Sequence, residues 1–253
     1  IGGELKNTFC LAKNSLFYPS PYLGDMSDLR TLQALRQALP RMERLLAINP
    51  VAVAADLHPR YETSRFAETL GLPVFKVQHH HAHVLSVMAE NDHLAPVIGV
   101  SFDGTGYGTD ETIWGGEILL STTRDFQRIA SLAPFFHAGG DLAAPAGWRL
   151  AVSLLHLCCG RDDALVLSQE LELATEKKAS SVIFQQEHGL NTTISTSAGR
   201  LFDAVSALLG IRRISTYEGE AAVYLQFAAE AAEKAGKSAQ ADALLARWKA
   251  DGT

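Results

Sequence analysis

The chain has 253 residues, 47% of them hydrophobic and 20% charged, which is long enough to bury a substantial core in one large domain or two lobes. Its formal net charge of −6 provides no overall basic surface, so a nucleic-acid partner is not expected. The three cysteines have no framework spacing and no apolar run reaches the ~18 residues that span a bilayer. We therefore expect a cytoplasmic protein without a membrane segment, and we interpret its start at Ile1 as that of a piece of a longer protein.

The first segments in chain order predict a hairpin followed by a helix. Residues 2–12 are typical of a turn that enters the first strand of a β-hairpin. Residues 27–48 carry leucines at helical spacing, with Ser27 as the expected N-cap. Pro40 is expected to end or kink this helix.

The next segments alternate between strands and helices. Short apolar runs typical of buried parallel strands occur at 50–56 and 73–78. Residues 64–71 and 81–91 are helical in composition. The polar stretch 185–199 is expected to form a loop.

The second half begins with a predicted hairpin. Residues 96–108 and 112–122 are its strands, and its turn lies in the glycine-rich stretch 103–108. Further helices are predicted at 145–159, 197–210 and 217–236. This order indicates an α/β class, which we divide into a first lobe, 1–95, and a second lobe, 96–253.

Four histidines fall within five positions in VQHHHAHVLS: His79, His80, His81 and His83. They follow a predicted strand, and carboxyl ends of strands are where open α/β sheets bind ligands. A helix would bring together the residues at 79 and 83, or those at 80 and 83, so the sequence alone does not fix a metal-binding pair. Asp103 is the expected third ligand, because it ends the next strand, which should lie beside the first. The donors suit divalent iron or zinc, and histidines that only line a cleft are the alternative.

Glycine-rich turns could bring backbone N–H groups to a phosphate, or could be plain turns. They are DGTGYG, with Gly104 and Gly106, and GGELKN, where Lys6 adds a cation. Neither matches the Walker pattern, so we reject a P-loop.

The predicted helices 197–210 and 217–236 also contain candidate ligand residues. In the first, Asp203 lies off an apolar stripe of leucines and a valine, and Gly199 opens the helix, where an anion or a sugar hydroxyl could sit. Glu220 lies at the start of the second, where acids commonly only compensate the helix dipole. Cys158 and Cys159 are expected to lie in the core.

Eight motifs, in order along essentially the whole chain, resemble those of the HypF family of carbamoyltransferases. They are GGELKNTFCL (2–11), GDM (24–26), DLHPRYETS (56–64), VQHHHAH (77–83), GVSFDGTGYGTDETIWGGE (99–117), GGDLAAPAGWR (139–149), SAGRLFDAVSALLG (197–210) and YEGEAA (217–222). Each motif alone is weak, whereas eight in sequence make the resemblance specific.

The resemblance implies an actin/Hsp70-like (ASKHA) two-lobed fold with a divalent metal, iron or zinc, and a carbamoyl adenylate in its cleft. It implies an enzyme that passes the carbamoyl group to the C-terminal cysteine of the partner HypE, toward the cyanide ligands of nickel–iron hydrogenase. A separate adenylate-forming domain of the same polypeptide makes the adenylate from ATP and carbamoyl phosphate.

Carried over to this chain, the resemblance assigns the metal to His79, His83 and Asp103, which are also the expected catalytic residues. The expected nucleotide-side residues are Lys6, Asn7, Gly104, Gly106, Gly199, Asp203 and Glu220. The family's later SGG motif and its Asn-Asp-Gly-Gly stretch do not occur here, so we expect the second lobe to be incomplete. Arg149 is not assigned, because it lies farther from Pro145 than in the family pattern.

Two alternatives to this function stay open. One is a related O-carbamoyl- or tRNA threonylcarbamoyl-transferase, against which the acidic charge argues mildly. The other is a non-catalytic fragment that only docks the partner.

Overall fold

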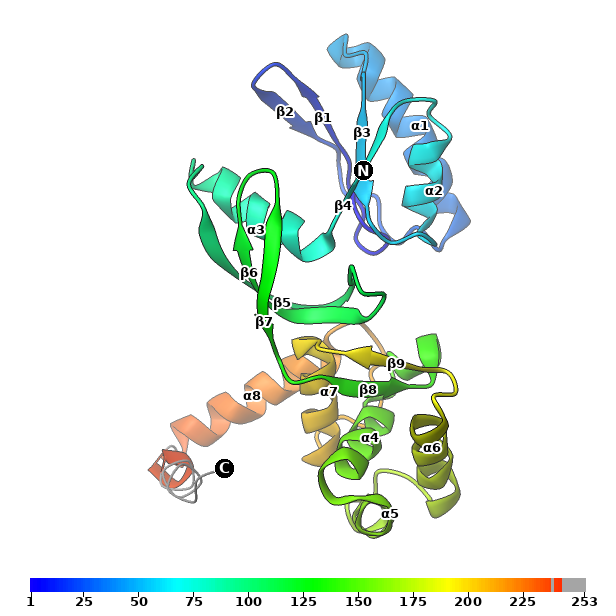
Figure 1. Cartoon of the computed structure of the whole chain (residues 1–253), viewed down its shortest axis with the longest axis vertical. Coiled ribbons are helices and arrows are strands. Elements are labelled where there is room, and N and C mark those ends of the chain that lie inside the picture. The colour runs from blue at the N-terminus through cyan, green and yellow to red at the C-terminus, as the bar shows by residue number, and fades with distance from the viewer. Residues whose placement is uncertain (238, 243–253) are drawn as a thin grey trace. The chain divides into compact units, whose positions relative to one another are not determined.

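The computed structural model describes residues 1–237 and 239–242, and they confirm the predicted α/β class (Figure 1). The chain divides into two compact units. The first comprises residues 1–101, 106–111 and 117–130, and the second comprises 102–105, 112–116 and the described residues from Ser131 onward. The lobe boundary between residues 95 and 96 stays a prediction.

The first unit begins with small sheets and the helices that cover them. Its first elements are β1 (Cys10–Lys13), β2 (Leu16–Pro19), α1 (Leu29–Leu46), β3 (Val53–Asp56), α2 (Glu62–Glu68), β4 (Val74–Val77) and α3 (His79–Glu90). The predicted hairpin is the antiparallel pair β1–β2. The two apolar runs form the parallel pair β3–β4, in which Asp56 lies opposite Val77.

Helix α1 supplies much of the core of this unit, through the leucines that recur at helical spacing. Leu32, Leu35 and Leu39 are buried against Phe9 and Phe66. The free energy gained by burying these side chains offsets the loss of the backbone hydrogen bond that Pro40 cannot donate inside the helix.

The expected end and the expected N-cap of α1 are both wrong. Pro40 does not end the helix, which continues to Leu46, and a kink at this residue stays a prediction. The N-cap is Asp28 rather than Ser27, because the Asp28 carboxylate accepts a hydrogen bond from the Arg30 N–H at 2.8 Å.

A five-stranded sheet has the order β5–β6–β9–β8, with β7 paired to β6. Its strands are β5 (Val97–Tyr107), β6 (Ile113–Ser121), β7 (Phe126–Ser131), β8 (Phe135–Ala138) and β9 (Thr192–Ser195). The predicted strands at 96–108 and 112–122 are confirmed, but their turn is not at 103–108. Strand β5 continues to Tyr107, and the chain turns at 108–112, where Glu111 has a left-handed φ of 64°.

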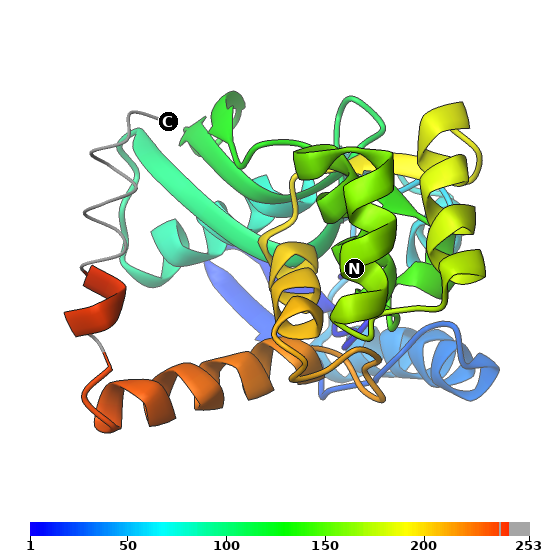
Figure 2. The same ribbon diagram turned by 90° about the horizontal axis from the view of Figure 1, so that it is seen from below.

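The second unit is mostly helical. Its helices are η1 (Gly140–Ala143), α4 (Gly147–Cys159), α5 (Arg161–Glu170), α6 (Glu176–His188), α7 (Ala198–Leu208) and α8 (Glu220–Lys234). Helix α4 packs against α5, α6, α7 and strand β8 (Figure 2). Val152, Val182 and Ile183 are fully buried in this core. No helix among the described residues combines the length and apolar character needed to cross a bilayer.

The three helices predicted in this half are confirmed, while the loop predicted at 185–199 is wrong in part. Helix α6 continues to His188, and residues 192–195 form strand β9. The polar residues of β9 gave no apolar alternation from which a strand could be predicted. Tertiary pairing with β8 and β6 makes this segment a strand.

The buried face of α7 is also different from the predicted stripe. Ala204 and Ala207 are fully buried and Asp203 is 4% exposed, whereas Leu209 is 65% exposed. The backbones of α4 and α7 come so close that a Cβ on Gly147 of α4 would lie 2.7 Å from the Asp203 carbonyl oxygen of α7. Close packing therefore selects small side chains here rather than leucines.

Cys158 and Cys159 are exposed, so the expectation that they lie in the core is wrong. The buried residues of α4 all lie between Gly147 and Ser153. The last turn of the helix extends beyond the core, and its apolar composition does not reflect burial.

Candidate metal and nucleotide site

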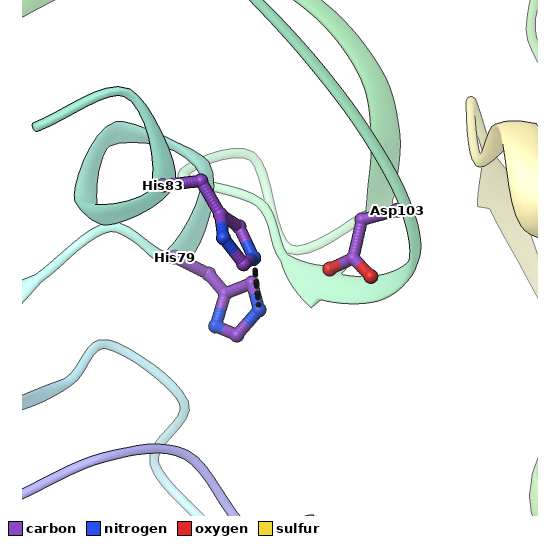
Figure 3. Close-up of side chains that lie close together, drawn as sticks. All are labelled: His79, His83 and Asp103. Carbon is purple, nitrogen blue, oxygen red and sulfur yellow. Dashed lines mark hydrogen bonds between the residues drawn. The ribbon is translucent and has the colours of Figure 1, made fainter. Parts of the chain in front are cut away.

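The histidine pair is positioned by the start of helix α3. Strand β4 ends at Val77, and Gln78 caps the helix because its side-chain oxygen accepts a hydrogen bond from the His81 N–H at 2.9 Å. Helical spacing then places His79 and His83 on one face, where their Nε2 atoms lie 3.2 Å apart (Figure 3).

Asp103 completes a group of three potential ligands. One ligand atom each from His79, His83 and Asp103 lies within 4.8 Å of the others. The structure groups these three residues together, as the sequence predicted, but for another reason, and their role as metal ligands stays a prediction. Asp103 lies inside β5 rather than at its end, and β4 pairs with β3 instead of joining the sheet of β5.

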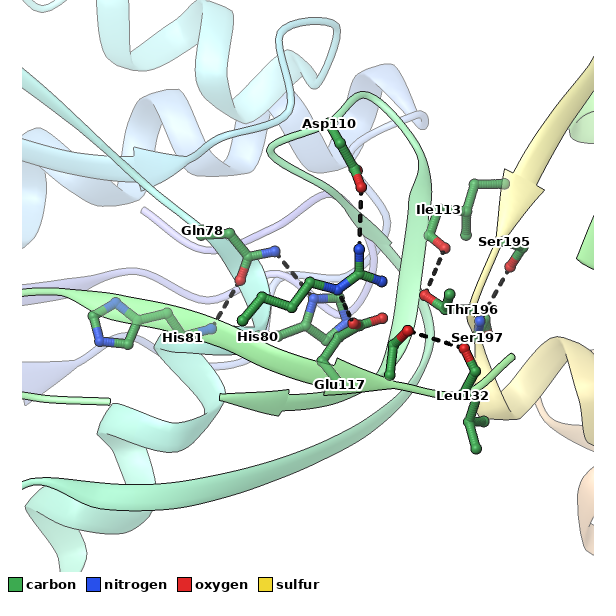
Figure 4. Close-up of polar contacts among 12 residues, drawn as sticks. Gln78, His80, His81, Asp110, Ile113, Glu117, Leu132, Ser195, Thr196 and Ser197 are labelled. Carbon is green, nitrogen blue, oxygen red and sulfur yellow. Dashed lines mark hydrogen bonds and ion pairs between the residues drawn. The ribbon is translucent and has the colours of Figure 1, made fainter. Parts of the chain in front are cut away.

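The other two histidines of the run have structural contacts. His80 is fully buried, and its Nδ1 lies 3.1 Å from the Gln78 side-chain nitrogen (Figure 4). The Nε2 of His81 lies 3.0 Å from the Thr122 carbonyl oxygen, to which it donates. The structure therefore pairs the Nε2 atoms of His79 and His83, while His80 and His81 make contacts with Gln78 and Thr122.

Asp56 was not among the residues expected at the site. Its Oδ2 lies 2.7 Å from the Nδ1 of His79. Burial raises the pKa of Asp56, but hydrogen bonds from His79 and from the His58 N–H outweigh it, so the pKa lies below its ordinary value. The sequence did contain a signal, because Asp56 ends one of two predicted parallel strands and His79 follows the other.

The donors fit a divalent transition metal. Two imidazole nitrogens and a carboxylate oxygen are ligands that both iron and zinc accept. Nitrogens bound at about 2.0–2.1 Å with an angle of about 90–110° lie about 2.8–3.4 Å apart. The 3.2 Å separation of the two Nε2 atoms falls in this range.

The first loop for which a nucleotide contact was expected, around Lys6 and Asn7, is a tight turn. Lys6 is exposed and has a left-handed φ of 51°. Asn7 is buried, and its side-chain nitrogen donates to the Gly3 carbonyl oxygen at 2.6 Å. The Asn7 N–H donates to the Gly24 carbonyl oxygen at 2.8 Å, which ties this loop to the GDM motif.

The start of α7 is fixed on strand β5. The Ser197 hydroxyl caps α7 and lies 2.7 Å from the Gly104 carbonyl oxygen. A Cβ on Gly199 would lie 2.7 Å from the Cα of Gly104, so only glycine allows this approach. These contacts explain Gly199 structurally, and its role toward a nucleotide stays a prediction, as does that of Gly104.

Gly106 faces the His80 ring, where an added Cβ would lie 2.3 Å from a ring carbon. This glycine is thus required by packing inside the first unit. A role toward a phosphate stays a prediction for it as well.

Asp203 and Glu220 each have a basic neighbour. The Asp203 carboxylate lies 2.9 Å from the Arg200 guanidinium, but burial outweighs this pairing and raises the pKa of Asp203. Glu220 accepts hydrogen bonds from the N–H and the hydroxyl of Thr216 and lies 3.1 Å from Arg212. Their predicted contacts with a nucleotide are not tested by these interactions.

Comparison with known proteins identifies the family. The profile of the HypF Kae1-like domain matches residues 1–90. The profile described as carbamoyltransferase, Kae1-like domain, second subdomain, matches residues 99–250.

Curated relatives and solved structures agree with these matches. The chain is 38% identical over 231 residues to the probable carbamoyltransferase HypF of Methanocaldococcus jannaschii, covering 89% of this chain and 30% of that protein. It is 38% identical over 239 residues to the carbamoyltransferase HypF of Synechocystis sp., covering 89% of this chain and 31% of that protein.

Full-length HypF, solved in a phosphate- and nucleotide-bound form, matches with a TM-score of 0.83 and 36% identity, over 88% of this chain and 35% of that one. HypF of T. kodakarensis matches with a TM-score of 0.81 and 35% identity, over 89% of this chain and 31% of that one. The predicted ASKHA-like fold is confirmed by these matches, and the chain spans about a third of the length of its relatives. By its profile matches and its relatives, the chain belongs to the HypF carbamoyltransferase family, within the Kae1-like region.

Proposed function

We propose that this chain is the carbamoyl-transfer segment of a HypF-type enzyme. Its substrate is a carbamoyl adenylate, made by an adenylate-forming domain of the same polypeptide, and its acceptor is the C-terminal cysteine thiol of HypE. The observation that carries the proposal is the convergence of ligand atoms from His79, His83 and Asp103 within 4.8 Å in a chain of this family.

The reaction needs no nucleophile from the chain. The acceptor thiolate attacks the carbamoyl carbon, a C–S bond forms, and the C–O bond to the phosphate of AMP breaks. The thiol proton passes to solvent before attack, and AMP leaves with the electron pair of the broken bond. The exposed cysteines are not required, and the pKa of Cys159 is raised by burial and by Asp163 and Cys158, which disfavours its thiolate.

The side chains of the site would orient the adenylate. His79, His83 and Asp103 would hold a divalent iron or zinc ion, which when bound acts as a Lewis acid toward carbonyl or phosphoryl oxygens. The backbone around Gly104, and Lys6 with Asn7, would bind the nucleotide, while Gly199, Asp203 and Glu220 would lie on its ribose side. The fixed start of α7 on β5 supports this assignment, because preorganised N–H groups need a rigid backbone.

The test uses carbamoyl adenylate labelled in the carbamoyl group and purified HypE as the acceptor. We expect label on the HypE protein, dependent on added iron or zinc, and none on an acceptor whose terminal cysteine is replaced by serine. The double variant His79→Ala/His83→Ala should reduce transfer by at least about 100-fold, the scale of a lost electrostatic contribution. Label on tRNA or a small alcohol instead would contradict the proposed acceptor, and no label on any of them would contradict the activity.

A further inference from the structure

The Asp56 carboxylate is held in one orientation at the end of strand β3. Its side chain is 5% exposed. Oδ1 accepts a hydrogen bond from the His58 N–H at 2.8 Å, while Oδ2 lies 2.7 Å from the Nδ1 of His79. With both oxygens engaged, the carboxylate has a fixed direction toward the histidine ring.

This contact determines which ring nitrogen of His79 carries hydrogen. A carboxylate only accepts hydrogen bonds, so Nδ1 must be the donor. In the neutral ring the lone pair is then on Nε2, which lies 3.2 Å from the Nε2 of His83. Without Asp56, the His79 ring could place its hydrogen on Nε2 instead and lose its ability to bind a metal there.

The backbone around Asp56 has support that does not depend on the carboxylate. The Asp56 carbonyl oxygen accepts a hydrogen bond from the Ser64 hydroxyl of α2 at 3.0 Å. Strand β3 is also paired in register with β4 at this position. Removing the carboxylate therefore changes the environment of the His79 ring more than it changes the strand.

We propose that Asp56 is a positioning residue that fixes the His79 tautomer and directs its Nε2 toward the metal. This inference rests on the metal site of the proposed function. Carboxylates that hold metal-binding histidines in this way typically change metal affinity 10–100-fold when removed. All of the residues involved belong to the first unit.

The first measurement is the tautomer of His79 in the metal-free chain, read from the imidazole ¹⁵N shifts at about pH 8, where an ordinary imidazole is neutral. We expect hydrogen on Nδ1 in the wild type and a mixture of tautomers in Asp56→Ala. Hydrogen on Nε2 in the wild type would overturn the proposal. This measurement depends on neither a bound metal nor carbamoyl transfer.

The second measurement is zinc affinity by competition with a chelator. Asp56→Ala should bind zinc about 10–100-fold more weakly, and Asp56→Asn, which can still accept from Nδ1, should lie between it and the wild type. Ser64→Ala is the matched control, because it removes support from the Asp56 backbone but keeps the carboxylate, and it should bind zinc as the wild type does.

The two proposals fail in different ways. Unchanged zinc affinity in Asp56→Ala, with affinity lost in His79→Ala, would refute the positioning role alone. Unchanged zinc affinity in His79→Ala would refute the metal site. The tautomer measurement would then still decide whether Asp56 orients the His79 ring. Equal losses in Ser64→Ala and Asp56→Ala would assign the effect to the strand end and overturn the proposal.

Discussion

Strand β5 passes so close to the ring of His80 that no side chain fits at Gly106. A Cβ there would lie 2.3 Å from the ring Cε1. The ring cannot easily move, because it is fully buried and contacts the Gln78 side chain. Interiors packed at this density resist even one added methyl group.

We expect Gly106→Ala to lower the free energy of unfolding by about 2–3 kcal/mol, the upper part of the range for overpacking. Urea denaturation followed by circular dichroism would measure the loss. Gly104→Ala is the control, since its Cβ would meet only the far end of Arg200 at 3.6 Å. A loss of equal size in both variants would contradict the packing explanation.

The histidine pair is expected to determine the metal content of the chain. Purified without an affinity tag and supplied with iron or zinc, the wild type should retain about one ion per chain, as a three-ligand site predicts. His79→Ala/His83→Ala should retain none. A saturating metal at 100 times its Kd should also stabilise the wild type by about 2.7 kcal/mol.

Elemental analysis and thermal unfolding are the two readouts of this prediction. His93→Ala changes an exposed histidine outside the pair and should behave as the wild type. Equal metal content in all three proteins would show that the ion binds elsewhere.

At the scale of single elements, the start of α8 depends on Glu220. The Thr216 N–H lowers the pKa of Glu220, burial opposes it, and the Thr216 hydroxyl and Arg212 lower it further. The folded pKa thus lies below the ordinary value of 4.5. The stabilisation from this carboxylate is complete above the unfolded pKa and is lost as the pH falls through the folded pKa.

We therefore expect Glu220→Gln to be less stable than the wild type at pH 7, with a difference that shrinks as the pH falls below about 4.5. Urea midpoints between pH 7 and pH 3 would show this convergence. The exposed Glu170→Gln should follow the wild-type profile throughout. A constant difference between wild type and Glu220→Gln would mean that the ionised carboxylate contributes nothing.

At the scale of the whole molecule, β5 presents one apolar side to solvent. It is the terminal strand in the order of the described sheet. Gly99 faces α3, where its Cβ would clash with Val84, so the alternating Ile98 and Val100 point to the opposite side. These two side chains are 68% and 60% exposed. Apolar side chains on an edge strand promote association.

We expect the chain to self-associate with rising concentration, and Ile98→Thr/Val100→Thr to reduce this association. Sedimentation velocity over a concentration series would measure it. Because both positions are exposed, the unfolding free energy should change by no more than about 0.5 kcal/mol per site. Val51→Thr, which changes an exposed valine away from β5, should leave association unchanged. An unaffected double variant would assign association to another surface.

The sequence predicted several elements in which a local pattern reflected burial, although it missed α6, whose buried Ala179, Val182 and Ile183 also recur at helical spacing. The leucines of α1 and the apolar runs of β3 and β4 were recognised for this reason. The polar strand β9 and the small-residue face of α7 were missed, because pairing with β8 and close packing on α4 determine them. The turn predicted at 103–108 belongs instead to strand β5, which pairs with β6 and continues to Tyr107.

The sequence by itself determined the α/β class, the family resemblance and a histidine run at the end of a strand. These follow from residue order and periodicity, which are local properties of the chain. Only the tertiary structure paired His79 with His83, brought Asp103 near them and placed Asp56 on the far nitrogen of His79. Helical spacing had already offered the histidine pair, but the distances to Asp103 and Asp56 join residues far apart in the chain, which no local pattern encodes.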